Sequence, residues 1–366
     1  MKKCTKKGVS TKTMGQGVAS IGMDLSDRTA EFHALDRKAN TIGTGKVILV
    51  SAEVQRWASE IAPTVIAIEA GTHSPWVSRV LEACGHEVIV ANPVKVALIT
   101  QNQNKRDRVD AELLARLALF DRKLLFPIRH RGEGAQIDLQ LIRTREVAVQ
   151  LRTKAIGHVR GAVKSFGARV PKCSAEAFVK TAKEAIPEVL QATLLPMLGQ
   201  IDGLTKTIAG YERQIEKLVA ERYPEVARLT QIKGVGALTG LAFVLVLEDA
   251  GRFRSSRSVG AYLGLTSKKD QSGDDDPQRG ITKAGDQLLR RLLTQSAHYI
   301  LGHFGEDCDL RRHGEKISAR GGKRAKKRAT TAVARKLSVL MHRLWVSGEK
   351  YDPLRNSRGA ELVVAA

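Results

Sequence analysis

The feature that most constrains the fold is the run Thr64-Val65-Ile66-Ala67-Ile68, which ends at Glu69. A continuous run of apolar, largely β-branched residues suits a strand that is buried on both faces of a sheet. The segments on either side of this run must therefore supply neighbouring strands and covering helices.

Those segments alternate in the way that a mixed α/β domain requires. A turn signal, Ser26-Asp27-Arg28, separates the first two β-prone runs, and a third run can complete a meander. Beyond it, segments with helical spacing alternate with strand-like runs. The predicted strands are 18–25, 29–36, 41–50, 64–68 and 87–91, and the predicted helices are 51–61, 76–84 and 106–119. The order β-β-β-α-β-α-β-α is that of an RNase H-like fold.

The rest of the chain is predicted to be helical. From about Gly132 to Ala220 the strand signals vanish and apolar residues recur at steps of three, four and seven, which is typical of long helices packed as a hairpin or coiled coil. We expect a spacer arm or an oligomerisation element there. Further helices are predicted at 254–264 and 284–301, with a polar loop at 266–281. The expected organisation is a basic tail (1–17), an α/β domain (18–130), a helical spacer (131–222), a mainly α C-terminal domain (223–346) and a second tail (347–366).

Charge indicates the class of partner. The chain carries 60 Lys and Arg against 38 Asp and Glu, a net charge of +22, which predicts a polyanionic partner, either nucleic acid or an anionic membrane surface. Aromatic residues make up only 4 %, which argues against a base-stacking platform. The longest charge-free apolar stretch, 234–247, is too short to span a bilayer. The basic N-terminus has no apolar run behind it and the four cysteines are widely spaced, so we expect no signal peptide and a reducing cytoplasm.

Four acidic residues stand where they could converge. Asp24 ends the first predicted strand and Glu69 ends the fourth, and these strands are neighbours in an RNase H-like sheet. Asp107 and Asp110 are three residues apart on one predicted helix, so both fall on one face. Clustered carboxylates need a cation, and hard oxygen ligands suit Mg²⁺ or Mn²⁺. Two such ions can activate the attacking oxygen and stabilise the leaving oxygen in phosphodiester chemistry.

Each acid also has a simpler interpretation. An Asp at a strand end is usually a turn residue, and Asp107 could be a helix-start carboxylate that faces the macrodipole. The coincidence of all four at suitable elements, in a strongly basic protein, favours the metal site. Other acids sit in predicted turns and are not assigned to it, namely Asp27, Asp36 and Asp274-Asp275-Asp276.

The motifs around the four acids resemble those of a known family. They are Gly22-Met23-Asp24, Ile68-Glu69-Ala70, Asn104-Lys105-Arg106-Asp107-Arg108-Val109-Asp110-Ala111 and Leu114-Ala115. These strings resemble the DEDD transposases of bacterial insertion sequences, most closely those of the one-ten/eleven-eleven family. The resemblance implies a RuvC-like N-terminal domain in which Asp24, Glu69, Asp107 and Asp110 form the metal-binding tetrad.

A second set of motifs resembles the C-terminal transposase domain of the same family. It comprises Ala261-Tyr262-Leu263-Gly264-Leu265, Gln271-Ser272-Gly273, Gly280-Ile281-Thr282-Lys283-Ala284-Gly285-Asp286, and Leu289, Arg290, Leu292 and Leu293. The family's Ser-Gly loop carries a nucleophilic serine, which by resemblance is Ser272. This sequence departs from the family at Ser267, where Pro is usual, and at Ala284, where Arg is usual. Neither change removes a reacting group, although the loop could be shaped differently.

Several basic residues are candidates for phosphate contact. The turn Ile232-Lys233-Gly234-Val235-Gly236 resembles a helix-hairpin-helix, whose backbone N–H groups can hold a phosphate, and a plain tight turn between core helices is an equal alternative. The run 323–328 is of a kind that is usually a solvated face, but in this protein we expect it to contact phosphates. The predicted nucleic-acid-binding residues are Lys233, Lys283, Arg290, Lys323, Arg324, Lys326, Lys327 and Arg328.

The resemblance implies a site-specific DNA recombinase of an insertion sequence, located in the bacterial cytoplasm at the nucleoid. Such proteins work with a structured noncoding RNA that pairs with donor and target DNA, and they assemble as dimers that pair into tetramers. Their composite active site joins the metals of one protomer to the serine of another, and cleavage gives a covalent phosphoserine. Two alternatives stay open. One is a hydrolytic nuclease of the Holliday-junction-resolvase type, and the other is a non-catalytic nucleic-acid-binding protein whose acids are structural.

Overall fold

The computed structural model describes residues 17–96, 107–268 and 279–357, and for Asp107 and Arg108 it describes the backbone only. The chain divides into two compact units, residues 1–131 and 132–366, which we call the N-terminal and the C-terminal unit and describe separately.

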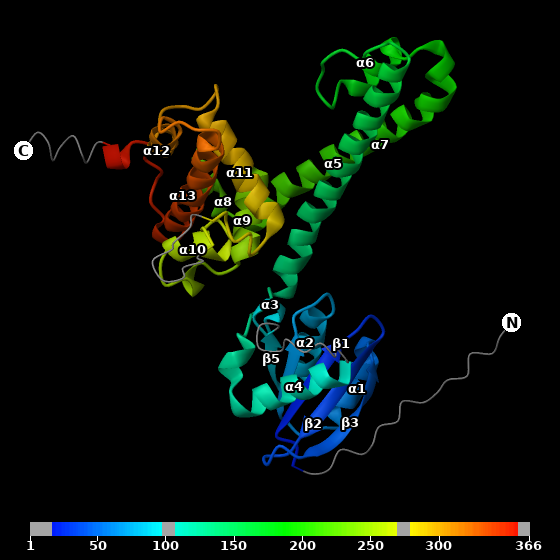
Figure 1. The fold of residues 1–366 in the computed structure, drawn as a ribbon, viewed down its shortest axis with the longest axis vertical. Helices are drawn as coiled ribbons and strands as arrows, with labels where there is room; N and C mark the ends of the chain where they lie inside the picture. The colour runs from blue at the N-terminus through cyan, green and yellow to red at the C-terminus, as the bar shows by residue number, and fades with distance from the viewer. Residues whose placement is uncertain (1–16, 97–106, 269–278, 358–366) are drawn as a thin grey trace, which may run out of the picture. The chain divides into compact units, whose positions relative to one another are not determined.

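The N-terminal unit is built on a mixed five-stranded sheet (Figure 1). Its strands are β1 (Ser20–Leu25), β2 (Thr29–Leu35), β3 (Thr41–Ile48), β4 (Val65–Glu69) and β5 (Glu87–Ala91). They lie in the order β3-β2-β1-β4-β5, with β1, β2 and β3 as an antiparallel meander and β4 and β5 parallel to β1. The five predicted strands are therefore confirmed, as is the pairing of the first strand with the fourth.

Helices cover both faces of this sheet. They are α1 (Ser51–Ser59), α2 (Ser74–Ala83), α3 (Pro93–Val96), α4 (Asp107–Phe120) and the short 3-10 helix η1 (Arg122–Leu125). Ile21, Met23 and Ile68 point to one face, where they pack in a core with side chains of α1 and α2. Ala67 points to the other face and packs with Leu114 of α4, the helix that crosses that face in Figure 1. The sheet is thus buried on both sides, as the apolar run of β4 requires.

Two long helices begin the C-terminal unit, α5 (Glu133–Ser165) and α7 (Glu188–Arg222), with the shorter α6 (Phe178–Ala185) between them in the chain. The long helices pack against each other, and α6 packs on α7, as Figure 1 also shows. One core joins the end of α5, α6 and the start of α7. A second core joins Leu139 of α5 and Ile215 of α7 to the helices that follow. The predicted pair of long helices is therefore present, with no strand between residues 132 and 222.

The remaining helices share one hydrophobic core with α9, which is apolar on every side. They are α8 (Val226–Leu229), α9 (Ala237–Leu247), η2 (Ala250–Arg252), α10 (Arg257–Tyr262), α11 (Gln287–Leu301), α12 (Asp309–Ser318) and α13 (Ala325–Ser347). Every residue of α9 from Thr239 to Leu247 is buried. A helix that is hydrophobic all round belongs inside a domain, and α9 is the centre of this one.

Two helix predictions in this unit need correction. Helix α11 begins at Gln287, whereas the sequence pattern predicted a start at Ala284. The reason is local: Gly285 has a left-handed φ of 74°, and the Asp286 carboxylate accepts a hydrogen bond from the backbone N–H of Leu289, which makes Asp286 the N-cap. The helix predicted at 254–264 is confined to residues 257–262.

The chain beyond α13 is tied back to the start of α12. The carboxylate of Asp309 accepts hydrogen bonds from the backbone N–H groups of Asn356 and Ser357 and from both side chains. The backbone N–H of Asp309 in turn donates to the carbonyl of Pro353. Among the described residues no helix is both long and apolar enough to cross a membrane.

Candidate functional site

Helix α4 lies directly on β1 because two small residues of the strand allow it. A Cβ atom on Gly22 would overlap the carbonyl oxygen of Ala111 and the amide nitrogen of Ala115, so only glycine permits this approach. Two residues earlier on the same face, the Ser20 hydroxyl donates a 2.9 Å hydrogen bond to the carbonyl of Ala115. The sequence analysis assigned no role to Ser20 or Gly22, although Gly22 belongs to the motif Gly22-Met23-Asp24.

These contacts fix how the strand and the helix are aligned. Ser20 meets Ala115 and Gly22 meets Ala111, so a step of two residues along β1 matches one turn back along α4. The lengths agree, since two strand residues advance about 6.7 Å and four helical residues about 6.0 Å. The next step on the same face of β1 is Asp24, and the next turn of α4 begins at Asp107. The backbone therefore places these two positions opposite each other.

The second strand acid follows from the sheet register. Parallel pairing runs from Ser20 beside Val65 to Met23 beside Ile68, so Asp24 and Glu69 occupy the next position of the two strands. Adjacent positions in neighbouring strands share a face, and here that face is the one covered by α4. Both side chains are half-buried.

The fourth acid, Asp110, is also half-buried and precedes the Ala111 contact point in α4. In their backbone positions, two of the predicted acids end the neighbouring strands β1 and β4, and the other two stand on the first turn of α4, the helix that packs on these strands. Among the side chains that the structure describes, no three His, Cys, Asp or Glu residues form a group that could hold a metal ion. The side chain of Asp107 lies outside that set.

Two of the acids set aside as turn residues, Asp27 and Asp36, lie in the connections between strands of the meander. The Asp36 carboxylate accepts hydrogen bonds from the backbone N–H groups of Lys38 and Asn40. Asp27 is almost fully exposed beside Arg28. Asp274, Asp275 and Asp276 lie outside the described residues. His73, the histidine nearest to Glu69 in the sequence, accepts a hydrogen bond at Nδ1 from the Trp76 indole.

In the C-terminal unit the two matched motifs cross in direct contact. A Cβ atom on Gly264, where φ is +68°, would overlap the backbone of Ala284, and a Cβ atom on Gly285 would overlap the carbonyl of Tyr262. Both glycines have left-handed φ values, which other residues rarely adopt. The crossing therefore requires glycine at each position, both for the backbone conformation and for the missing side chain. The crossing brings together the segments before and after the polar loop.

Above the crossing, backbone hydrogen bonds close the base of that loop. The N–H groups of Lys283, Thr282 and Lys268 donate to the carbonyls of Gly264, Thr266 and Gly280 at 2.9–3.1 Å. Ser267 and Ile281 form an antiparallel bridge between them. Ser272 belongs to the segment that this base closes but lies outside the described residues.

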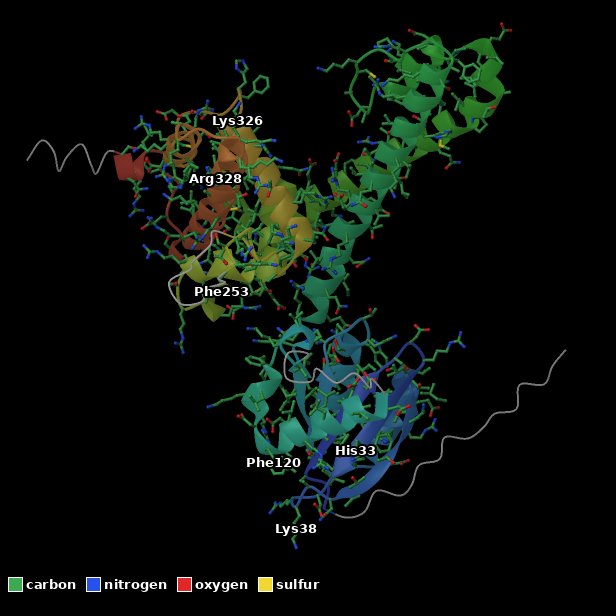
Figure 2. All side chains as sticks on the ribbon, viewed as in Figure 1. His33, Lys38, Phe120, Phe253, Lys326 and Arg328 are labelled. Atoms are coloured by element: carbon green, nitrogen blue, oxygen red, sulfur yellow. The ribbon has the colours of Figure 1, made fainter. Side chains whose placement is uncertain are left out.

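The basic run at the start of α13 is exposed on one side and anchored on the other. Ala325 and Ala329 are buried, whereas the cations around them are exposed, and Figure 2 labels two of these on the helix. The exposed cations are Lys323, Arg324, Lys326, Lys327 and Arg328. The first turn of α13 contains no acidic residue, so five positive charges stand at the positive end of a helix dipole. An anionic partner would relieve this repulsion.

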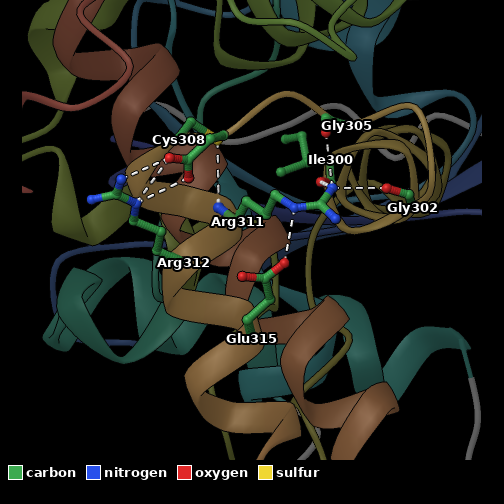
Figure 3. Close-up of polar contacts among 8 residues, drawn as sticks. Ile300, Gly302, Gly305, Cys308, Arg311, Arg312 and Glu315 are labelled. Carbon is green, nitrogen blue, oxygen red and sulfur yellow. Dashed lines mark hydrogen bonds and ion pairs between the residues drawn. The ribbon is translucent and has the colours of Figure 1, made fainter.

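Other arginines of the unit hold the fold itself. Nη1 of Arg311 donates to the carbonyls of Ile300, Gly302 and Gly305 at 2.8–3.0 Å and so caps the C-terminal end of α11 (Figure 3). The Nε of Arg311 also pairs with Glu315 at 2.8 Å. Arg311 is therefore a structural residue rather than a free surface cation.

The remaining predicted nucleic-acid contacts differ in their surroundings. Lys283 is exposed, and Lys233 is exposed with its ammonium 3.7 Å from the Glu306 carboxylate. Gly234 of the Gly-x-Gly turn packs so closely on Tyr299 of α11 that a Cβ atom there would collide with the ring. Arg290, by contrast, directs its guanidinium toward backbone carbonyls at the base of the Ser272 loop.

Comparison with known proteins matches both units. A family model for a DEDD transposase of the IS110 type matches residues 21–167. A second model, described as the transposase IS116/IS110/IS902 family, matches residues 226–309. Together the two models span more than half of the chain. The chain belongs to the IS110 family of insertion-sequence transposases.

Transposases from several bacteria are similar to this chain over most of their length. The chain is 29 % identical over 290 residues to the transposase for insertion sequence element IS1328 of Yersinia enterocolitica, covering 78 % of this chain and 84 % of that protein. It is 25 % identical over 354 residues to the transposase for IS1111A of Coxiella burnetii, covering 90 % of each. A probable family 20 transposase of Pseudomonas aeruginosa is 27 % identical over 301 residues, 80 % of this chain and 87 % of that protein.

Proposed function

We propose that this IS110-family transposase cuts and rejoins DNA strands with four metal-binding carboxylates and a serine nucleophile. The observation that supports the proposal is the backbone alignment of β1, β4 and α4: Asp24 and Glu69 end neighbouring strands, and Asp107 and Asp110 stand on the first turn of the helix that crosses these strands. Three separate chain segments supply these acids, and a purely structural role for each would not require this alignment.

The architecture supports an RNase H-like interpretation of the N-terminal unit. An antiparallel meander leads into two parallel strands, and the order β3-β2-β1-β4-β5 puts the first strand at the centre. Asp24 and Glu69 then belong to the carboxyl ends of two central strands, and α4, which packs on these strands, begins with the segment that contains Asp107 and Asp110. In open α/β sheets the carboxyl ends of parallel strands are the usual position of a site.

The donor set fits a hard divalent cation. Aspartate and glutamate oxygens are the ligands that Mg²⁺ and Mn²⁺ prefer. In this proposal Asp24, Glu69, Asp107 and Asp110 hold the metal ions, which when bound supply charge stabilisation for the attacking and leaving oxygens. The close contact between the backbones of Gly22 and Ala111 would set the distance between the acids of α4 and those of the strands.

Ser272 would supply the nucleophile from the C-terminal unit. In the cleavage step a bond forms between Oγ of Ser272 and phosphorus, and the bond between phosphorus and the leaving deoxyribose oxygen breaks. The serine gives up its proton and the leaving oxygen takes one up as a hydroxyl. The phosphoserine ester conserves the energy of the phosphodiester, so a strand hydroxyl can later displace the serine and rejoin DNA.

Nucleic-acid binding would rest on the exposed cations at the start of α13, which we call the basic cluster and define as Lys323, Arg324, Lys326, Lys327 and Arg328. Phosphate contacts of this kind hold nucleic acid without reading its sequence. We propose that a structured noncoding RNA of the element, pairing with donor and target DNA, supplies the sequence specificity.

The test of the metal site is the variant Asp107→Asn, which keeps the side-chain shape and removes one negative charge. DNA carrying the ends of the element, with its RNA, is the substrate. We expect lost cleavage in Mg²⁺, weakened Mn²⁺ binding by electron paramagnetic resonance, and unchanged nucleic-acid affinity. The control Asp27→Asn changes an exposed turn acid and should leave all three readouts at the wild-type level. Wild-type cleavage by Asp107→Asn would mean that the metal assignment is wrong.

A shared site can be tested by mixing variants. If the carboxylates of one protomer act with the serine of another, in a dimer or a tetramer, Asp107→Asn and Ser272→Ala are each inactive alone. A mixture would contain some assemblies with one intact composite site. Partial recovery of strand exchange is therefore expected, and none would arise if each protomer used its own serine.

A further inference from the structure

We infer that Arg290 is a positioning residue for the loop that carries Ser272, rather than a contact for nucleic-acid phosphate. The inference rests on the proposed function in so far as Ser272 is the nucleophile. The sequence analysis predicted that Arg290 binds nucleic acid, whereas its hydrogen bonds in the structure go to backbone carbonyls at the base of the loop.

Arg290 lies on the first full turn of α11 and reaches back to the crossing of Gly264 and Gly285. Its Nη1 donates to the carbonyl of Ala284 at 2.7 Å and to that of Leu263 at 3.1 Å, with the Gly285 carbonyl at 3.5 Å. One guanidinium nitrogen thus binds both chain segments of the crossing, at the residue that precedes each glycine. The two N–H groups of Nη1 are used by the two shorter bonds.

The hydrogen bonds of Arg290 hold the crossing at a point where the two glycines have no room for side chains of their own. Because the backbones touch at Gly264 and Gly285, neither glycine can carry a side chain that would lock the crossing. Two glycines also leave the free chain unusually flexible. Hydrogen bonds from a charged donor are stronger than those between neutral groups, and the planar fork of Arg presents its donors in a fixed geometry. Arg290 therefore replaces the missing side-chain packing.

The backbone of Arg290 is held in place by Asp286, which is itself bound to two other parts of the unit. The backbone N–H of Arg290 donates to the carbonyl of Asp286, and one carboxylate oxygen of Asp286 caps the helix at Leu289. The other carboxylate oxygen accepts a 3.2 Å bond from Arg143 of α5. With only 10 % of its side chain exposed, Asp286 links the loop base to the long helix.

Holding the loop base matters because attack by a serine depends on distance and direction. A displacement of about 1 Å at a reacting atom can cost on the order of 100-fold in rate. A phosphate contact would have a different signature, since each one contributes about 0.9 to the slope of log affinity against log salt for duplex DNA. The two roles are therefore separable by experiment.

The first measurement is hydrogen exchange at the backbone amides of Lys268, Thr282 and Lys283, whose bonds close the loop base. In Arg290→Met we expect exchange at these amides to rise about 10-fold or more, as for a locally opened segment, with Arg290→Lys intermediate. The control is Arg311→Met, which removes a comparable set of arginine–carbonyl bonds at the opposite end of α11. It should leave these three amides protected.

The second measurement is the single-turnover rate of covalent protein–DNA adduct formation at saturating nucleic acid. We expect Arg290→Met to lower this rate by about 10- to 100-fold, with unchanged affinity and salt slope, and Arg290→Lys to recover part of the rate. Arg311→Met should react at close to the wild-type rate at a temperature where all variants are folded.

The two measurements separate the possible failures. Unchanged exchange at the loop base together with a flatter salt slope would overturn the inference and make Arg290 a phosphate contact. Equal rate loss in Arg311→Met would also overturn it, because general destabilisation would then explain the effect. A wild-type protein that forms no adduct would contradict the proposed function, while the exchange data would still decide whether Arg290 holds the loop.

Discussion

The backbone of Gly22 in β1 touches the carbonyl of Ala111 in α4, with no room for a side chain between strand and helix. This contact sets the height of α4 over the sheet and places the start of the helix opposite Asp24. The geometry of the proposed metal site therefore depends on a residue that carries no reactive group.

Gly22→Ala should destabilise the N-terminal unit and displace the acids of α4. The added Cβ would overlap backbone atoms of Ala111 and Ala115 and lie 2.9 Å from the Cβ of Leu114, so the helix must move as a whole. Overpacking of this kind costs about 1–3 kcal/mol or more. The measurement is denaturant unfolding of the purified protein. Gly71→Ala is the control, because nothing lies within 4 Å of its added Cβ, and equal midpoints for both variants would contradict the account.

Replacing the five cations of the basic cluster by Gln should weaken nucleic-acid binding without changing site preference. Each lost phosphate contact should flatten the slope of log affinity against log salt by about 0.7 to 0.9. Affinity measured over a range of salt concentrations gives this slope directly.

A matched control removes the same charge elsewhere. Five exposed lysines lie in α5, in α6 and in the connection between them, and their replacement by Gln lowers the net charge equally: Lys154, Lys164, Lys172, Lys180 and Lys183. This variant should keep most of the salt slope. Equal loss in both variants would show that net charge, and not the basic cluster, governs binding.

The start of α11 could be predicted from the sequence less well than the strands of the sheet. Strands such as β4 and β5 are evident from their apolar runs, because burial on both faces leaves a continuous local signal. The start of α11 is less evident, since Lys283 and Ala284 are compatible with a helix by residue type. The left-handed Gly285, which lies against Tyr262, and the Asp286 N-cap together set that boundary.

The candidate site divides in the same way. The four acids could be chosen from the sequence because strand ends and helical spacing are local features, and the family motifs surround them. The role of Arg290 could not, because one of its acceptors, the carbonyl of Leu263, is 27 residues away in the chain. Side-chain bonds to distant carbonyls leave no pattern in the sequence.

Acid should release the chain beyond α13 from α12. Burial alone would raise the pKa of Asp309, but hydrogen bonds from Ser357 and Asn356 outweigh it and hold the pKa below its ordinary value. A lowered pKa means that the carboxylate stabilises the folded state above the unfolded pKa of about 3.9 and that this contribution is lost as the pH falls further. Asp309→Ala should cost about 1.5–3 kcal/mol of unfolding free energy at pH 7, and the difference from wild type should shrink below pH 4. A pH-independent difference would contradict this role.

The covalent intermediate gives the most direct test of the proposed chemistry. Wild-type protein, element DNA, its RNA and Mg²⁺ are mixed, denatured and separated, and any DNA-linked protein is digested and analysed by mass spectrometry. The account predicts a denaturation-resistant adduct with the nucleotide on Ser272, absent in Ser272→Ala and in Asp107→Asn although both still bind nucleic acid. Cleaved DNA without an adduct in the wild type, or strand exchange by Ser272→Ala, would contradict it and favour a nuclease that uses water.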